Sequence, residues 1–374
     1  MKEWRASWGY RPIDRRKLFY EVEDETQRVT SIHNICGDTI RLVLSNEWSE
    51  EELCLEGVWV GKKDQRVQAN FEGKQKVTLA PGEIRFSDTI DMNMTPGEEI
   101  YVESYLKKKT LVQTVCKVKS ELLVRVRVHK GSPEKNEIEP WEEVVDNRFY
   151  GVFRIDILTD DPVQTIVAFG DSITNHGHWS DCLARRLYDA YPGKVSVINK
   201  GISGNRILHD ASNPQNKGGA FGIAGIKRFE DDIFGAKLPV DQILVLEGVN
   251  DLIHPGYDTT LDEIVTAKEI EEGLKFYVET AHNHQARIFL CTILPFDRFR
   301  KYGQDEMNRK ALEVNAWIRQ QKISDGVFDF AEAVKDPHAP LQLEAGCDSG
   351  DHLHPSAQGG RKIAENIDLK MLME

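Results

Sequence analysis

The sequence has no long apolar run and no excess of basic residues. No stretch approaches the ~18 consecutive apolar residues that a membrane-spanning helix requires. No apolar segment follows residues 1–5, as it would in a secretory signal. The 48 Lys and Arg are outnumbered by 61 Asp and Glu, giving a net charge of −13. Nucleic acids and anionic membranes are bound through basic patches, so we expect neither partner. Because the sequence shows neither a secretory signal nor a membrane span, we expect a cytoplasmic protein.

Cysteine pairs with redox or metal-binding spacing are also missing. The six cysteines are scattered, and no C-x-x-C pair occurs. In a chain of this size, such spacing predicts free, buried thiols rather than a disulfide framework or a zinc site. The cysteines are Cys36, Cys54, Cys116, Cys182, Cys291 and Cys347.

The chain has two regions whose residue patterns predict different secondary structure. At roughly 100–200 residues per domain, its 374 residues predict two or three domains. Residues 1–158 contain short β-type runs separated by turns. Many short strands without a helical period predict an all-β domain of the sandwich or jelly-roll type. The runs are Thr39–Ser45, Val58–Val60, Lys76–Leu79, Glu83–Phe86, Ile100–Ser104 and Leu122–Val128.

Strands and helices alternate in residues 159–374. This alternation predicts a second domain of the α/β class with a parallel sheet, whose ligands bind beyond the carboxyl ends of the strands. Residues 129–147, rich in Glu, Lys, Asn and Pro, predict a linker or a long surface loop. The expected strands are Val163–Phe169, Val195–Asn199, Gln242–Leu246, Ala286–Ile293 and Gly326–Phe330, and the expected helices are 179–191, 261–283, 304–321 and the tail from Ser356.

Four polar segments carry the residues that can do chemistry. Gly170–Thr174, Asn199–Arg206 and Glu247–Asp251 each follow a predicted strand, and Asp348–Pro355 lies near the C-terminus. Ser172 opens a helix, where free N–H groups and the helix dipole favour a nucleophile. Each segment alone also has a simple structural explanation: a helix cap, a strand-to-loop turn, an Asx turn or a solvated loop.

The fourth segment supplies an acid–base pair. Asp351 and His354 are three residues apart, so one turn brings the carboxylate to the imidazole, as a serine hydrolase requires. His352 and His354 with two Asp could also bind a metal, but no H-E-x-x-H pattern and no clear third ligand cluster accompanies them. Because the segments converge at one sheet edge, they provide a nucleophile, oxyanion-hole donors and an Asp–His pair. That set is what acyl transfer to water needs.

These four blocks, in this order, resemble the SGNH or GDSL-type esterase and acylhydrolase family. The resemblance implies a flavodoxin-like three-layer α/β/α sandwich with a five-stranded parallel sheet. It implies Ser172 as the nucleophile, His354 as the general base and Asp351 as the group that orients it. Gly204 and Asn250, with the N–H of Ser172, would be the oxyanion donors. No metal or organic cofactor is needed.

Several stretches are similar to a bacterial branch grouped with xylan-degradation esterases, whose members also tend to carry an N-terminal β-rich segment. They are Gly201–Leu208, Arg228–Asp232, Leu246–Asp251 and Asp348–Pro355. This similarity implies hydrolysis of short-chain esters, with a small esterified substrate or an acetylated oligosaccharide as the partner. One departure is Val249, where many members have Thr, and it touches neither donor. Assembly of the protein into a homo-oligomer is left open by the sequence.

Smaller roles and other functions stay open as well. Asp171, Asn205 and Arg206 are candidate substrate-binding residues, with a helix cap for Asp171 and a salt bridge for Arg206 as structural alternatives. An acyltransferase acting on sugars would use the same catalytic residues. A glycan-binding protein with a vestigial hydrolase domain would use Trp48 or Trp59 as a sugar platform, against which stands a packing role for both side chains.

Overall fold

The computed structural model describes residues 2–63, 65–134, 140–144, 147–211 and 218–374. The chain divides into two compact units: residues 1–165 with 187–198 and 217–220, and residues 166–186, 199–216 and 221–374. The predicted domain boundary at residues 158 and 159 stays a prediction. Among the described residues, no helix is long and apolar enough to cross a membrane.

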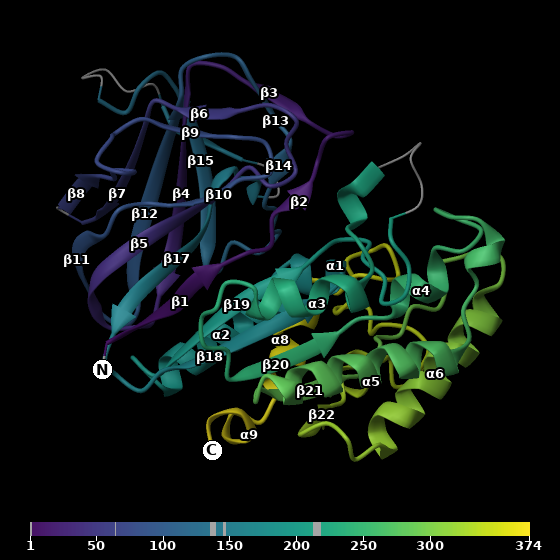
Figure 1. Ribbon diagram of the computed structural model, residues 1–374. Helices are drawn as coiled ribbons and strands as arrows, with labels where there is room; N and C mark the ends of the chain where they lie inside the picture. Colours follow the sequence, from purple (N-terminus) through teal and green to yellow (C-terminus); the bar gives the residue numbers. More distant parts are fainter. Residues whose placement is uncertain (1, 64, 135–139, 145–146, 212–217) are drawn as a thin grey trace. The chain divides into compact units, whose positions relative to one another are not determined.

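The N-terminal unit is built from antiparallel β-strands (Figure 1). One sheet has the order β1-β17-β5-β10, with β11 also paired to β5, and another has the order β16-β15-β4-β12-β7-β8. Three ladders of two strands pair β3 with β13, β2 with β14, and β6 with β9. The strands are β1 (Glu3–Gly9), β2 (Ile13–Asp14), β3 (Tyr20–Val22), β4 (Glu25–His33), β5 (Gly37–Ser45), β6 (Leu53–Leu55), β7 (Gly57–Lys62), β8 (Gln65–Gln68), β9 (Val77–Leu79), β10 (Ile84–Phe86), β11 (Ile90–Met94), β12 (Glu98–Leu106), β13 (Thr110–Val112), β14 (Thr114–Val115), β15 (Val124–Lys130), β16 (Glu142–Glu143) and β17 (Gly151–Thr159).

Alternating side chains bury one face of these sheets. In β11, Ile90, Met92 and Met94 are buried while Asp91 and Asn93 are exposed, the period of two that a half-buried strand shows. Buried residues from both sheets belong to a single hydrophobic cluster. The prediction of an all-β N-terminal region is confirmed.

The six predicted β-runs all overlap strands, and the described part of residues 129–147 contains strand residues as well as the predicted loop. Within the described part of this segment, Glu142–Glu143 forms β16 and pairs with β15. Arg127 of β15 donates to Glu143 at 2.6 Å, and the Trp141 ring lies 4.3 Å from the His129 ring. These contacts are between residues distant in sequence, so the local composition does not reveal them. Residues 135–139 and 145–146 of the segment lie outside the described residues.

The two tryptophans considered as a sugar platform pack against the protein. Trp59 of β7 is only 4% exposed, and the Arg66 guanidinium lies 4.9 Å from the centre of its ring. The Trp48 indole N–H donates to the Pro12 carbonyl, and Arg11 lies over its ring. These contacts favour the packing role for both side chains.

The C-terminal unit contains a five-stranded parallel sheet in the order β19-β18-β20-β21-β22 (Figure 1). Its strands are β18 (Gln164–Gly170), β19 (Val195–Gly201), β20 (Gln242–Leu246), β21 (Arg287–Cys291) and β22 (Gly326–Phe328). Every residue of β20 is buried, as in parallel strands covered on both faces. The strand order reverses between β18 and β20. In open α/β sheets, ligands bind at the carboxyl ends of the strands beside such a reversal.

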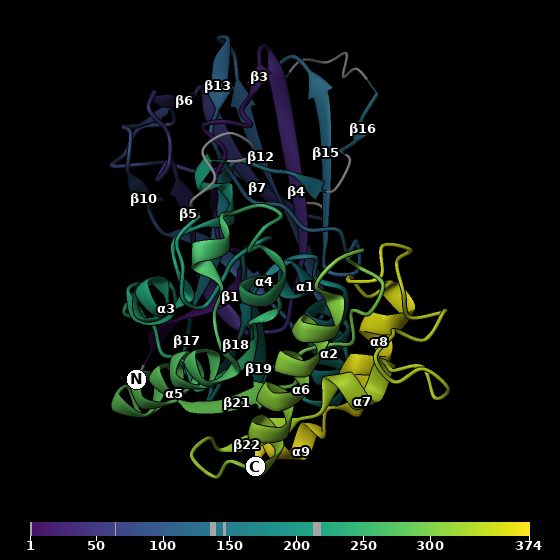
Figure 2. The ribbon, with the colours of Figure 1, turned by 90° about the vertical axis from the view of Figure 1, so that its right-hand side faces the viewer.

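Helices cover both faces of this sheet, which confirms the predicted α/β fold. Helix α5 packs against α3, α6 and β21, while α7 packs against α8, and Arg186 of α2 donates to the carbonyls of Ala364 and Ile367 at the end of α8. Figure 2 shows α3 and α5 on one flank and α7 and α8 on the other. The helices are α1 (Ser172–Asn175), α2 (His178–Ala190), α3 (Gly225–Phe234), α4 (Val249–Ile253), α5 (Ala267–Asn283), α6 (Gln304–Gln320), α7 (Phe330–Val334), α8 (Ala357–Asn366) and α9 (Leu369–Met373), with short 3-10 turns η2 (Gly218–Phe221) and η3 (Leu261–Glu263).

Two predicted elements are cut short by helix caps. The helix expected from residue 261 begins at Ala267, because Thr266 caps it: the Thr266 hydroxyl accepts from the Glu269 N–H and the Glu269 carboxylate accepts from the Thr266 N–H. The last strand ends at Phe328 rather than residue 330, since Asp329 caps α7. In both cases the apolar pattern runs on across a cap that stops the element.

Candidate active site

Ser172 stands at the junction of β18 and α1. Gly170 makes the junction possible: its φ is +155°, and a Cβ there would lie 2.0 Å from the Leu246 carbonyl oxygen. Asp171 caps α1 by accepting the Ile173 N–H at 2.9 Å. The Ser172 side chain is therefore fixed at the carboxyl end of β18, at the point where the strand order reverses.

A chain of hydrogen bonds joins Ser172, His354 and Asp351, here called the triad. His354 Nε2 lies 2.8 Å from Ser172 Oγ, and His354 Nδ1 lies 2.6 Å from Asp351 Oδ2. The other Asp351 oxygen accepts the backbone N–H groups of Leu353 and His354, at 3.0 and 2.8 Å. These backbone bonds fix the carboxylate, and the carboxylate in turn fixes the ring.

Asp351 is held in its ionised form. Partial burial acts to raise the pKa of its carboxyl, but the hydrogen bonds from the His354 side chain and backbone outweigh burial and hold that pKa well below its usual range. An ionised Asp351 accepts a hydrogen bond from the Nδ1–H of His354. In the neutral ring this leaves Nε2 without a proton and facing the Ser172 hydroxyl. This arrangement suits His354 to take a proton from Ser172.

Gly204 sits in a tight turn after β19. The Asn205 N–H bonds to the Ile202 carbonyl at 3.0 Å, and Gly204 at the third position of the turn has a φ of +80°. A Cβ there would lie 2.1 Å from the Phe221 ring, so a side chain fits neither the backbone nor the space. The Ser203 hydroxyl donates to Asn175 Oδ1 of α1 at 2.9 Å, which ties this turn to the helix that Ser172 opens.

Asn250 lies in the first turn of α4, directly after β20. Its side-chain Nδ2 donates one hydrogen to the Asn205 carbonyl at 2.8 Å, which leaves the second N–H of the amide for another acceptor. Among the described residues, the backbone N–H groups of Ser172 and Gly204 donate to no protein acceptor. The structure thus brings the predicted donors onto segments linked by direct hydrogen bonds.

Asp171, Asn205 and Arg206 make contacts inside the protein. Asp171 is 1% exposed and caps α1. Asn205 donates to the Phe221 and Ile223 carbonyls at 2.7 and 2.8 Å. The Arg206 guanidinium bonds to Glu263 and to the Asp210 carbonyl, at 2.7 and 2.6 Å. These contacts favour a cap, a loop anchor and a salt bridge over substrate binding.

A second Asp–His pair lies beside the triad. His352 Nδ1 is 2.7 Å from Asp348 Oδ2, and His352 has a φ of +62°. Within the part of the chain that the structure describes, no group of three or more His, Cys, Asp or Glu could hold a metal ion. The six cysteines are free thiols, as predicted, but only Cys116, Cys291 and Cys347 are buried.

Comparison with known families decides the identity. A sequence model described as the GDSL-like Lipase/Acylhydrolase family matches residues 168–362, more than half of the chain and all five residues of the triad and donor set. The chain belongs to this family. It is an ester hydrolase. A search of curated proteins found no match.

Solved structures similar to this GDSL-like hydrolase cover its C-terminal part. An acetylxylan esterase from Geobacillus stearothermophilus is 21% identical, covers 57% of this chain and 96% of its own, and has a TM-score of 0.43. A GDSL-like lipase from Bacteroides thetaiotaomicron is 16% identical, with 56% and 88% covered and a TM-score of 0.40. An α/β hydrolase from the metagenome of Lake Arreo, Spain, is 18% identical, with 55% and 94% covered and a TM-score of 0.42. These values leave the substrate open.

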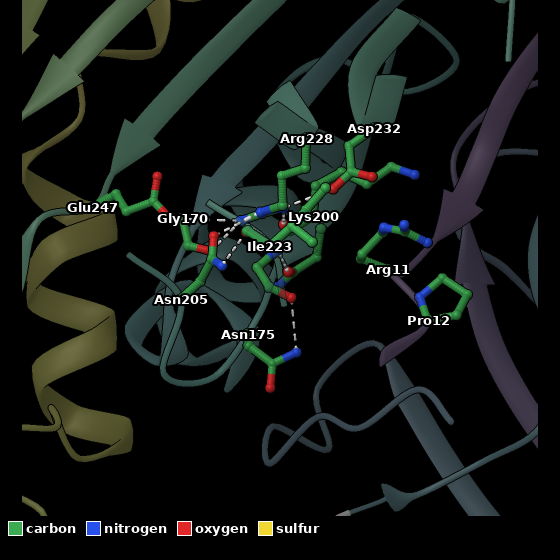
Figure 3. A network of polar contacts seen from close by, with 12 residues as sticks. Arg11, Pro12, Gly170, Asn175, Lys200, Asn205, Ile223, Arg228, Asp232 and Glu247 are labelled. Carbon is green, nitrogen blue, oxygen red and sulfur yellow. Dashed lines mark hydrogen bonds and ion pairs between the residues drawn. The ribbon is translucent and has the colours of Figure 1, made fainter. Parts of the chain in front are cut away.

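Arg228 of α3 is the residue of this GDSL-like hydrolase that the sequence did not single out. It is 2% exposed, and its guanidinium donates to three residues around the site (Figure 3). Nη2 donates to the Gly170 carbonyl at 2.9 Å, Nη1 to the Lys200 carbonyl at 2.9 Å, and Nε to Asn205 Oδ1 at 2.7 Å. The only sequence signal is the Arg228–Asp232 stretch, which resembles the xylan-esterase branch.

Buried acids surround this guanidinium. Asp232 accepts from Nη1 at 2.7 Å, and a Glu247 oxygen lies 3.6 Å from Nη2. Burial raises the pKa of Glu247 to about 7, although Arg228 and the hydrogen bond from Tyr277 act to lower it. Burial likewise raises the pKa of Asp251 to about 6, against the backbone N–H groups of Ile207 and Leu208 that bond to it.

For Glu247→Gln we expect stability relative to wild type to improve as the pH rises. Because the pKa of Glu247 is raised from 4.5 to about 7, the folded protein holds a proton that the unfolded chain releases. Wild type therefore loses stability between these pH values, whereas glutamine does not titrate. We expect urea unfolding to show that, from about pH 5 to about pH 8, the free energy of unfolding of the variant rises by ~1–3 kcal/mol relative to that of wild type. Glu279→Gln, at an exposed position of α5, controls for the lost charge. If the difference in free energy of unfolding between Glu247→Gln and wild type did not change with pH, the raised pKa of Glu247 would be contradicted.

Proposed function

We propose that this protein is a serine esterase that hydrolyses short-chain carboxylic esters, O-acetyl groups of carbohydrates above all, through an acyl-enzyme. The observation that supports the mechanism is the triad, in which Ser172, His354 and Asp351 are joined by hydrogen bonds of 2.8 and 2.6 Å. The acetyl and carbohydrate parts rest on the sequence resemblance of the four blocks to the xylan-esterase branch.

In the first half-reaction, Ser172 Oγ attacks the ester carbonyl carbon while His354 Nε2 takes its proton. The carbonyl oxygen gains a negative charge, which the N–H groups of Ser172 and Gly204 and the Asn250 amide stabilise. His354 then gives the proton to the departing alcohol, and the acyl group stays on Ser172. Asp351 stabilises the imidazolium throughout without becoming protonated.

In the second half-reaction, a water molecule replaces the alcohol. His354 takes a proton from the water as its oxygen attacks the acyl carbon, and the same donors hold the oxyanion. Collapse of this intermediate returns the proton to Ser172 Oγ and releases the carboxylic acid. One ester and one water molecule are consumed, and Ser172, His354 and Asp351 return to their starting state.

Asn250→Ala should give a folded enzyme with a kcat lower by ~10²–10³-fold, the usual cost of one oxyanion donor. KM should change much less, because the oxyanion exists only after attack. Rates with p-nitrophenyl acetate, together with the unfolding temperature, measure both. Asn283→Ala, at the exposed end of α5, is the matched control. A kcat within about twofold of wild type would remove Asn250 from the oxyanion hole.

A substrate series tests the proposed class directly. Wild type should cleave p-nitrophenyl acetate faster than longer acyl esters, and should release free acetate from acetylated xylo-oligosaccharides. Transfer of acetyl to an added sugar, in place of free acetate, would make the protein an acyltransferase. Binding of the oligosaccharide with no turnover of any ester would favour a glycan-binding protein.

A further inference from the structure

The oxyanion donors are carried by three separate segments that meet at one buried side chain. Ser172 follows β18, Gly204 follows β19 and Asn250 follows β20. Figure 3 shows the Arg228 guanidinium among Gly170, Lys200 and Asn205, with dashed lines to these groups. Gly170 is two residues before Ser172, and Asn205 is the neighbour of Gly204. Arg228 thus bonds next to two of the three donors.

The third donor is linked to Arg228 through one residue. Asn205 Oδ1 accepts from Arg228 Nε at 2.7 Å, and the backbone carbonyl of Asn205 accepts from Asn250 Nδ2 at 2.8 Å. A shift of Asn205 would therefore move the Gly204 N–H and release the Asn250 amide together. This coupling makes the three donors depend on one another.

The guanidinium is suited to this task and shielded from substrate. It is planar and offers five N–H donors in a fixed fork, so it can hold several carbonyls in one rigid geometry. The Phe169 ring lies 3.9 Å below it and sets its plane, and the side chain is 2% exposed. Glu247 and Asp232 balance its charge. Arg228 can thus act on the reaction only through the segments it holds.

We propose that Arg228 is a positioning residue that holds the segments after β18, β19 and β20 in register and thereby sets the geometry of the oxyanion hole. This inference rests on the proposed function, since it assigns a role toward an oxyanion formed at Ser172. An oxyanion hole loses catalytic power when its donors are displaced by about 1 Å, a loss of ~10²-fold in rate.

Arg228→Lys is the direct test. Lysine keeps the buried charge, but its three N–H donors leave from one nitrogen and cannot reach three acceptors that are spaced for the three nitrogens of a guanidinium. We expect kcat for p-nitrophenyl acetate to fall by ~10–100-fold while KM stays within about twofold, because only the transition state uses the displaced donors. Asp231→Asn is the matched control: it removes a carboxylate from an exposed position of the same helix, and its kcat should stay close to that of wild type.

A double-mutant cycle separates positioning from general destabilisation. If Arg228 acts through the oxyanion hole, Arg228→Lys should cost at least about threefold less in the Asn250→Ala background than in wild type. Should Arg228→Lys fail to fold, Asn205→Ala breaks the same link from the loop side and leaves the buried charges in place. That variant should show the same fall in kcat at unchanged KM.

The outcomes are distinct from those for the proposed function. Folded Arg228→Lys or Asn205→Ala with the kcat of wild type overturns the positioning role, provided that Ser172→Ala is inactive. A loss in Arg228→Lys that multiplies fully with that of Asn250→Ala, or that appears equally in Asp231→Asn, overturns it as well. Full activity in Ser172→Ala would instead overturn the esterase mechanism itself.

Discussion

Ser172→Ala should lose at least about 10⁴-fold in kcat toward p-nitrophenyl acetate, because no other group in the triad can form the acyl-enzyme. Ser172 Oγ is the atom that His354 Nε2 approaches at 2.8 Å. The protein should remain folded, since alanine fits the first position of a helix and Asp171 still caps α1. Steady-state rates and circular dichroism measure the two parts of this prediction.

Ser324→Ala provides the matched control for this variant. Ser324 lies just before β22, at the end of the sheet opposite the carboxyl ends of the strands, and bonds to the Gly326 carbonyl. Its activity should equal that of wild type. If Ser172→Ala kept more than about a tenth of the wild-type kcat, a different group would have to carry the acyl transfer.

Asp351→Asn should lower kcat by ~10⁴-fold, the effect seen when a triad histidine is held in the wrong tautomer. An asparagine oxygen can still accept the N–H groups of Leu353 and His354, so the loop should keep its shape. Its amide N–H₂ would then face His354 Nδ1, and the proton would move to Nε2, where it blocks attack by Ser172.

The neighbouring pair gives an unusually close control for this change. Asp348 and His352 are joined at 2.7 Å, the same chemistry within the same segment, but no hydrogen bond links His352 to Ser172 among the described residues. Asp348→Asn should lose less than about tenfold in kcat. Equal losses in the two variants would contradict the assignment of Asp351 as the group that orients the base.

Much of the fold follows from local patterns in the sequence. The buried strands of the parallel sheet are continuous apolar runs, so Gln242–Leu246 coincides with β20. The start of α5 is different, because the apolar pattern continues back from Ala267 into residues that a Thr266 cap excludes. Caps and edge pairing, as at Glu142–Glu143, depend on single hydrogen bonds that periodicity does not report.

The residues of the site also fall into those that local motifs predict and those that they do not. Ser172, Asp351 and His354 stand in short motifs whose residue types and spacing carry chemical meaning, and the structure joins them by hydrogen bonds. Arg228 bonds to groups 23 to 58 residues away in sequence, and no spacing rule predicts such contacts. A buried arginine is recognised only when the segments it holds are seen together.

Covalent labelling of Ser172 tests whether this serine forms the acyl-enzyme. A p-nitrophenyl organophosphate should transfer its phosphoryl group to Ser172 Oγ with release of p-nitrophenolate, because His354 takes the serine proton as it does with an ester. Intact-protein mass followed by peptide mapping should find one adduct, on the peptide that contains Ser172, with activity lost in parallel and with Asp351→Asn labelled far more slowly. Inactivation with the adduct on another residue, or sustained turnover with Ser172 fully labelled, would contradict the account.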